Sequence, residues 1–236
     1  MALPPSGTTD EAFLREVDEE YRRDQMLSIW QRYGRVIIGV VVVGLLALAG
    51  WLYYQNHTAG MAGKRGEEYD AALQFLQQNQ PAQALPALDK VAGGNSDGYA
   101  ALARISEGNL MLDRNDAKGA VAKFAAVVND QSVGQPYRDL ALIRQTAAEF
   151  DALKPEVVIQ RLGTLANPDS PWFGTAGEMV AAAYLKAGNR AAAGKLFAQI
   201  AQGGASVPES IRQRAVQLAG VLGVDAAAQS KEAKVQ

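Results

Sequence analysis

Three pairs of neighbouring acidic residues are the first candidates for chemistry in this sequence. Two carboxyl groups held close together can act as a general acid and a general base when their surroundings separate their pKa values. All three pairs fall on the surface of a predicted helix or at a predicted turn, where solvent-exposed acidic residues are common. We therefore interpret them as solvated or helix-capping residues. The pairs are Glu67 and Glu68, Asp113 and Asp116, and Glu149 and Asp151.

Nucleophilic and metal chemistry lack the residues that they need. His57 is the only histidine, and it is separated from the serines and from Asn109 by a predicted linker, so nothing indicates a Ser-His-Asp arrangement. A zinc site would need further ligands at a suitable spacing, and none lies near His57. The sequence contains no cysteine, which excludes disulfides, thiolate metal sites and cysteine nucleophiles. We predict a protein that is not an enzyme and needs no cofactor and no metal ion.

The charge balance argues against a nucleic-acid partner. The chain has 23 Lys and Arg against 25 Asp and Glu, which gives a formal net charge of -2. Residues 55–236 contain equal numbers of basic and acidic residues. A nucleic-acid-binding surface requires a clustered excess of Lys and Arg, so we exclude this class of partner.

An uncharged apolar segment, residues 36–54, stands apart from the rest of the chain. In a helix it spans roughly the 30 Å of a bilayer's hydrocarbon core, and Trp and Tyr flank it as in an interfacial belt. A cleaved signal peptide is the main alternative, because Ala47-Leu48-Ala49 resembles a cleavage site, and a buried core helix is another. A signal peptide has a shorter apolar region after a short basic one, whereas 35 residues of mixed charge precede this segment. We favour an uncleaved transmembrane helix.

Basic residues around the apolar segment predict its orientation. Arg22, Arg23, Arg32 and Arg35 precede it, whereas only Lys64 and Arg65 follow within a similar distance. Flanking Lys and Arg favour the cytoplasmic side. The sequence therefore predicts that residues 1–35 form a cytoplasmic tail and that residues 55–236 cross the membrane.

The segments around the anchor have weaker patterns. In residues 1–35, Phe13, Val17 and Tyr21 form a narrow apolar stripe at helical spacing, which suits either a solvated lead-in helix or a docking helix for a partner. Residues 55–65 contain two glycines without periodicity and are predicted to be a linker. Residues 223–236 are predicted to be a polar tail.

Residues 66–222 contain a repeat in which a small residue is followed four positions later by a large one. The spacings between successive copies are 36, 38 and 35 residues, close to the roughly 34 residues of a tetratricopeptide repeat. Gly108 falls where that repeat requires a small side chain. Arg104, Glu107, Gln145 and Gly177 depart from it, since these positions are usually apolar. The repeated pairs are Ala84 and Leu88, Ala120 and Phe124, Val158 and Leu162, and Ala193 and Phe197.

These repeats predict an all-α protein: an N-terminal transmembrane helix, then a tetratricopeptide-like α-solenoid of about four helix hairpins and a C-terminal capping helix. Hairpins of this kind bury their apolar faces only by stacking on one another. The expected hairpins are 62–78 with 81–92, 97–113 with 116–130, 136–151 with 154–166, and 171–187 with 190–202, closed by a helix over 208–222.

The layout and the tail together resemble the ancillary SecYEG translocon subunit (YfgM-like) family. The likeness lies in the charged stretch 13–34, "FLREVDEEYRRDQMLSIWQRYG", and in a single anchor followed by repeats. The resemblance implies a single-pass protein of the bacterial inner membrane with a periplasmic domain. It further implies association with the Sec translocon and with periplasmic chaperones or emerging client polypeptides. The alternative is a generic membrane-anchored tetratricopeptide scaffold in envelope assembly or cell division.

A partner-binding groove is predicted on the concave side of the solenoid, where the first helix of each hairpin lies. The same alignment also places Leu73, Leu76, Leu140, Glu178 and Leu185 there. The sequence leaves open whether many of these side chains belong to the core instead, because it does not fix the rotation of each helix. The principal predicted groove residues are Tyr69, Leu102, Ile105, Asn109, Leu112, Ile143 and Phe150.

Overall fold

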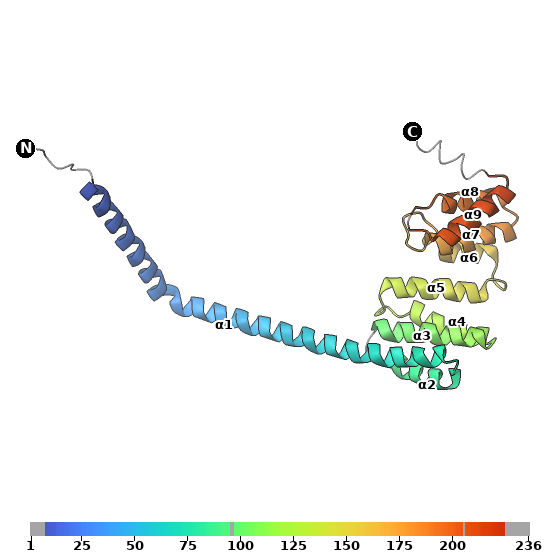
Figure 1. Ribbon diagram of the computed structural model, residues 1–236, viewed down its shortest axis with the longest axis horizontal. Helices are drawn as coiled ribbons and strands as arrows, with labels where there is room; N and C mark the ends of the chain where they lie inside the picture. The colour runs from blue at the N-terminus through green and yellow to red at the C-terminus, as the bar shows by residue number, and fades with distance from the viewer. Residues whose placement is uncertain (1–7, 95–96, 205, 225–236) are drawn as a thin grey trace, which may run out of the picture. The chain divides into compact units, whose positions relative to one another are not determined.

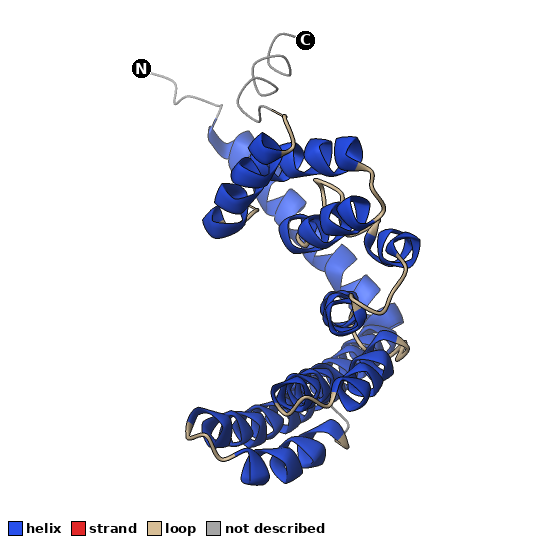
Figure 2. Ribbon diagram, turned by 90° about the vertical axis from the view of Figure 1, so that its right-hand side faces the viewer, coloured by secondary structure: helices blue, strands red, loops and turns tan. Residues whose placement is uncertain are grey.

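The computed structural model of the protein describes residues 8–94, 97–204 and 206–224, and every regular element in these ranges is an α-helix. The chain divides into two compact units, residues 1–61 and 62–236. Because the described elements are all helices, the all-α prediction is confirmed (Figures 1 and 2). The helices are α1 (Thr8–Gln77), α2 (Pro81–Ala92), α3 (Asp97–Asp113), α4 (Ala117–Val128), α5 (Gln135–Glu149), α6 (Pro155–Leu162), α7 (Phe173–Lys186), α8 (Arg190–Ala201) and α9 (Glu209–Val221).

Helix α1 contains the apolar segment 36–54, whose side chains are exposed along its whole length. In the described part of the chain, α1 is the one helix long and apolar enough to cross a membrane, with a mean hydropathy of 2.5 in its most apolar stretch and none of that stretch buried. So many exposed apolar side chains would be unfavourable in water. A buried core helix, one of the alternatives, is excluded.

The predicted linker at residues 55–65 is helical in the structure, as part of α1. The sequence of α1 contains no proline that would interrupt the helix. Glycines such as Gly60 and Gly63 cost only about 1 kcal/mol each in a helix, which the helical segments on either side can offset. The predicted linker is therefore helical, and the division between the two units falls within it, after Met61. The predicted apolar stripe at Phe13, Val17 and Tyr21 lies outside the described side chains.

The hairpins of residues 62–224 form at the predicted places and succeed one another along a stack (Figure 1). Three of the four hairpin turns contain a residue with positive φ, namely Asn79, Asn115 and Gly188, at 56°, 62° and 78°. Asparagine and glycine tolerate this left-handed conformation, which ends the first helix and turns the chain back. Asp116 and Asn189 then cap the second helix by accepting hydrogen bonds from backbone N–H groups three residues on, at 2.9 and 3.0 Å.

The core confirms the repeat. All eight residues of the repeated small-and-large pairs on the second helices are buried, with at most 2% of their surface exposed. Gly108 is small for the predicted reason, since a Cβ there would lie 2.6 Å from the ring of buried Phe124. Gly177 departs from the repeat because Ile200 fills its space, and a Cβ would lie 2.9 Å from that side chain.

Polar contacts tie the third hairpin to the fourth. The Lys186 ammonium group on α7 donates to the backbone carbonyls of Phe150, Asp151 and Leu153, at 3.2, 2.9 and 3.2 Å. These carbonyls follow the end of α5, where helical partners are lacking.

The short α6 ends at Leu162, four residues before its predicted end. Within the same hairpin, Arg161 of α6 pairs with Glu149 of α5 at 2.7 Å.

Candidate functional site: a pocket between the first two hairpins

The acidic pairs found in the sequence mostly serve the fold. Glu68 pairs with Lys90 at 3.0 Å and with Arg65 at 2.8 Å, and these contacts lower the pKa of its carboxyl group. Asp116 caps α4, and Glu149 pairs with Arg161. Among the described residues, no group of three or more His, Asp or Glu could hold a metal ion. These residues therefore provide ion pairs and caps.

Two of the predicted groove residues are core residues instead. Ile105 on α3 is 5% exposed and Ile143 on α5 is 4% exposed, each within a separate apolar cluster. Leu112 and Phe150 are half-buried and pack against the same clusters. The prediction that Ile105 and Ile143 face a groove was therefore wrong, and the core alternative holds for both. The reason is the rotation of the two helices, which packs Ile105 with Phe124 of α4 and Ile143 with residues of α6 and α7.

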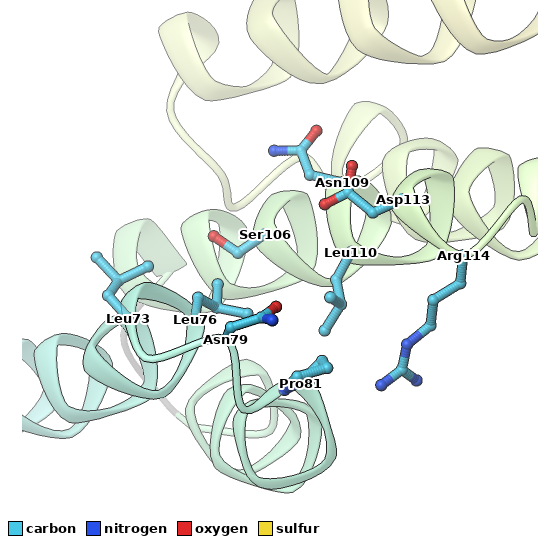
Figure 3. Close-up of a pocket in the computed structure, with 9 residues that line it drawn as sticks. All are labelled: Leu73, Leu76, Asn79, Pro81, Ser106, Asn109, Leu110, Asp113 and Arg114. Carbon is cyan, nitrogen blue, oxygen red and sulfur yellow. The ribbon is translucent and has the colours of Figure 1, made fainter.

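One open space among the described residues is a pocket of about 480 Å³. It lies between the C-terminal end of α1, the start of α2 and the second half of α3, as Figure 3 shows. Of the predicted groove residues, Leu73, Leu76 and Asn109 come together in it. Tyr69 lies beside it, with its hydroxyl 2.9 Å from the Ser106 hydroxyl. The lining residues are Leu73, Leu76, Asn79, Pro81, Ser106, Asn109, Leu110, Asp113 and Arg114.

The pocket combines an apolar side with polar groups. Leu110 extends from α3 toward Pro81 at the start of α2, and Leu76 lies nearby on α1 (Figure 3). Asn109 Oδ1 is buried and accepts no hydrogen bond in the structure. A buried carbonyl oxygen without a donor is unfavourable by about 1–3 kcal/mol. The amide of Asn109 points away from Leu110 and Pro81 in Figure 3, so this oxygen is not presented to a ligand between them.

A second, smaller cavity of about 270 Å³ lies between α6, α7 and α8. The sequence did not predict it, because it arises from the shortness of α6 and from the turns at 163–172 that follow it. Tyr184, Lys195 and Gln199 supply its polar groups. None of its lining residues is a predicted groove residue.

Glu107 is the most unusual polar residue of the domain, and the sequence marked it only as a departure from the repeat. Its side chain on α3 is completely buried. Lys123 Nζ lies 2.5 Å from Glu107 Oε2 and 3.2 Å from Asp89 Oδ1. The buried carboxyl group of Glu107 therefore shares the single Lys123 ammonium group with a second carboxyl group, that of Asp89.

The pKa values of this cluster follow from that environment. Burial, reinforced by the neighbouring Asp89 carboxyl group, raises the pKa of Glu107 to about 7, against the opposing effect of Lys123. A hydrogen bond from Glu107, together with Lys123, lowers the pKa of Asp89. Burial alone would lower the pKa of Lys123, but its bonds to Glu107 and Asp89 raise it.

Comparisons with known proteins agree with the fold. A family model described as a tetratricopeptide repeat-like domain matches residues 28–221. No solved structure matches the chain significantly.

Three curated relatives share the printed name "Ancillary SecYEG translocon subunit". The protein of Haemophilus influenzae is 24% identical over 134 residues, which cover 57% of this chain and 65% of that protein, slightly less than two thirds. The Escherichia coli protein is 22% identical over 72% of this chain and 82% of its own length. The protein of Aggregatibacter actinomycetemcomitans is 20% identical over 84% of this chain and 95% of its own length. These similarities confirm the resemblance indicated by the sequence.

Proposed function

Because the chain belongs to the tetratricopeptide repeat-like domain family, we propose that it is a non-enzymatic, membrane-anchored interaction module associated with the Sec translocon. The observation that carries this proposal is an unburied apolar helix joined to a repeat domain, in a chain that is similar over most of its length to two relatives named as translocon subunits. Tetratricopeptide-like stacks present extended surfaces for other polypeptides rather than a catalytic constellation.

The proposed location is the bacterial inner membrane, crossed once. The four arginines before the apolar segment, against two basic residues after it, support a cytoplasmic N-terminus. The repeat domain then lies in the periplasm. There it would meet polypeptides as they leave the channel, and the chaperones that receive them.

The proposed ligand is an extended, apolar segment of polypeptide bound in the pocket between the first two hairpins. A volume of about 480 Å³ falls in the range of ordinary binding pockets and accommodates a few side chains. Leu73, Leu76 and Leu110 suit apolar side chains. Asp113 is an exposed carboxylate that lines the pocket and can accept from a backbone N–H, the donor that every polypeptide segment carries irrespective of its sequence. This combination favours client polypeptides of varied sequence, or a segment of a chaperone.

Two pocket substitutions test this proposal in the full chain in detergent. Leu73→Glu places a charge against the apolar part of the ligand and is expected to raise the dissociation constant about tenfold, a loss of about 1.4 kcal/mol. Asp113→Ala removes an acceptor that lines the pocket and is expected to raise the dissociation constant several-fold, while the domain keeps its stability because Asp113 is exposed. The measurement is fluorescence anisotropy with labelled, reduced and carboxymethylated α-lactalbumin, a polypeptide that stays unfolded.

Val221→Glu, an exposed position on α9 away from the pocket, is the matched control for an added carboxylate and should bind as the wild type does. Wild-type affinity in both pocket variants, with unchanged melting temperatures, would show that polypeptides do not bind in this pocket.

A further inference from the structure

Three consecutive helices each contribute one charged side chain to the joint between the first and second hairpins. Asp89 comes from α2, Glu107 from α3 and Lys123 from α4. In the described part of the chain, the charged groups that face Glu107 are Asp89 and Lys123. Lys123 touches both carboxyl groups, so the cluster bridges the two hairpins.

The charge of this cluster depends on one proton. When Glu107 is ionised, two carboxylates share a single ammonium group and the cluster carries a net charge of -1. Asp89 reaches solvent, which screens its charge, but Glu107 is completely buried and has no such screening. When Glu107 is protonated, the cluster is neutral and the Glu107 O–H can donate to the Asp89 carboxylate. Desolvation and a like charge both favour this protonated form.

We propose that Glu107 is a proton-binding site that sets the strength of packing between the first two hairpins, which is tighter when Glu107 is protonated and looser when it is ionised. An ionised Glu107 gains hydration only if α2 separates from α3 and α4, so ionisation favours local opening of this joint. The joint also carries the pocket, since Leu73 and Pro81 lie on its first-hairpin side and Ser106 and Leu110 on its second-hairpin side.

The direction of the pH dependence follows from the pKa of about 7 for Glu107 in the folded chain, against its ordinary value of 4.5. Between these values the folded state binds more protons than the unfolded state, so stability falls as the pH rises toward 7. Well above pH 7 the stability that the protonated Glu107 contributes is lost completely. The lowered pKa of Asp89 affects stability only below its ordinary value of 3.8, and the raised pKa of Lys123 only above 10.5. Within this cluster, Glu107 alone acts between those limits.

Glu107→Gln tests the proposal in the full chain in detergent, because the amide keeps the shape of the side chain but cannot ionise. Melting temperatures would be measured by far-ultraviolet circular dichroism at about pH 5.5 and about pH 8.5. The melting temperature of the variant minus that of the wild type should be about 5 °C larger at the higher pH than at the lower one. Glu156→Gln, at an exposed position on α6, is the control and should shift the melting temperature equally at both pH values.

Hydrogen exchange locates the effect. After correction for intrinsic rates, raising the pH should reduce amide protection in α2 and α3 of the wild type but not in α8 or α9. Asp89→Asn, at a largely exposed position, gives a second variant and should weaken the pH dependence because it removes the second carboxylate. The proposal would be overturned if Glu107→Gln changed the melting temperature by the same amount at both pH values. It would also be overturned if raising the pH reduced amide protection evenly over α2 to α9.

Discussion

Replacing Ile105 by glutamate should unfold the repeat domain. Ile105 lies on α3 within the apolar cluster that includes Ala101, Phe124 and Val127, and almost none of its surface reaches solvent. A carboxylate there would have no partner, and its burial costs several kcal/mol, which is a large part of the 5–15 kcal/mol that ordinarily stabilises a domain. We expect loss of the cooperative melting transition in circular dichroism. Ile143→Glu should act in the same way through the cluster shared by α5, α6 and α7.

The matched control is Val216→Glu on α9, where half of the side chain is already exposed. This variant should melt within a few degrees of the wild type. If Ile105→Glu and Ile143→Glu stayed folded and lost only partner binding, both side chains would face a ligand, and the assignment to the core would be wrong.

Two arginines in the apolar segment should remove the chain from the membrane. Each arginine near the centre of a transmembrane helix costs about 2.5–3.5 kcal/mol of insertion free energy, so Val42→Arg combined with Leu46→Arg should abolish insertion. An alkaline phosphatase fused after Gln236 is active only outside the cytoplasm. It should be active in the wild type and inactive in the double variant, which should also move to the soluble fraction.

The control replaces Val42 and Leu46 by alanine, which keeps the segment uncharged and should leave reporter activity unchanged. An active reporter placed before Met1 of the wild type, with an inactive one after Gln236, would reverse the orientation. A wild-type chain that lacks the peptide containing Phe13 would show that the signal-peptide alternative is correct.

The fold was predictable because its signals are local. Alternating helices and turns, the small-and-large pairs such as Ala120 and Phe124, and the small residue Gly108 each follow from contacts within a single hairpin. The apolar segment was equally clear, because a bilayer requires a long run of uncharged residues.

The site was less predictable because it depends on how helices pack on one another. A change in helix rotation moves a residue such as Ile105 from an open face to the core, and the sequence spacing is the same in both cases. The pocket likewise depends on the turn at Asn79, which places Pro81 opposite Leu110. Glu107 could be recognised as an exception to the repeat, but its partners Asp89 and Lys123 lie on two other helices, and only packing brings them together. The helical form of residues 55–65 was not predicted, because the glycines there weaken a helix without ending it.

Site-specific photo-crosslinking in living cells tests the central claim, association with the Sec translocon, most directly. A photoreactive amino acid would be placed at Leu46 in the apolar segment, at Leu73 in the pocket, and at Val221 on α9 as the control. The account predicts SecYEG subunits among the products from Leu46, exported polypeptides or their chaperones among those from Leu73, and neither from Val221. Membrane-inserted, intact protein that gives no SecYEG product from Leu46 or Leu73 would contradict it.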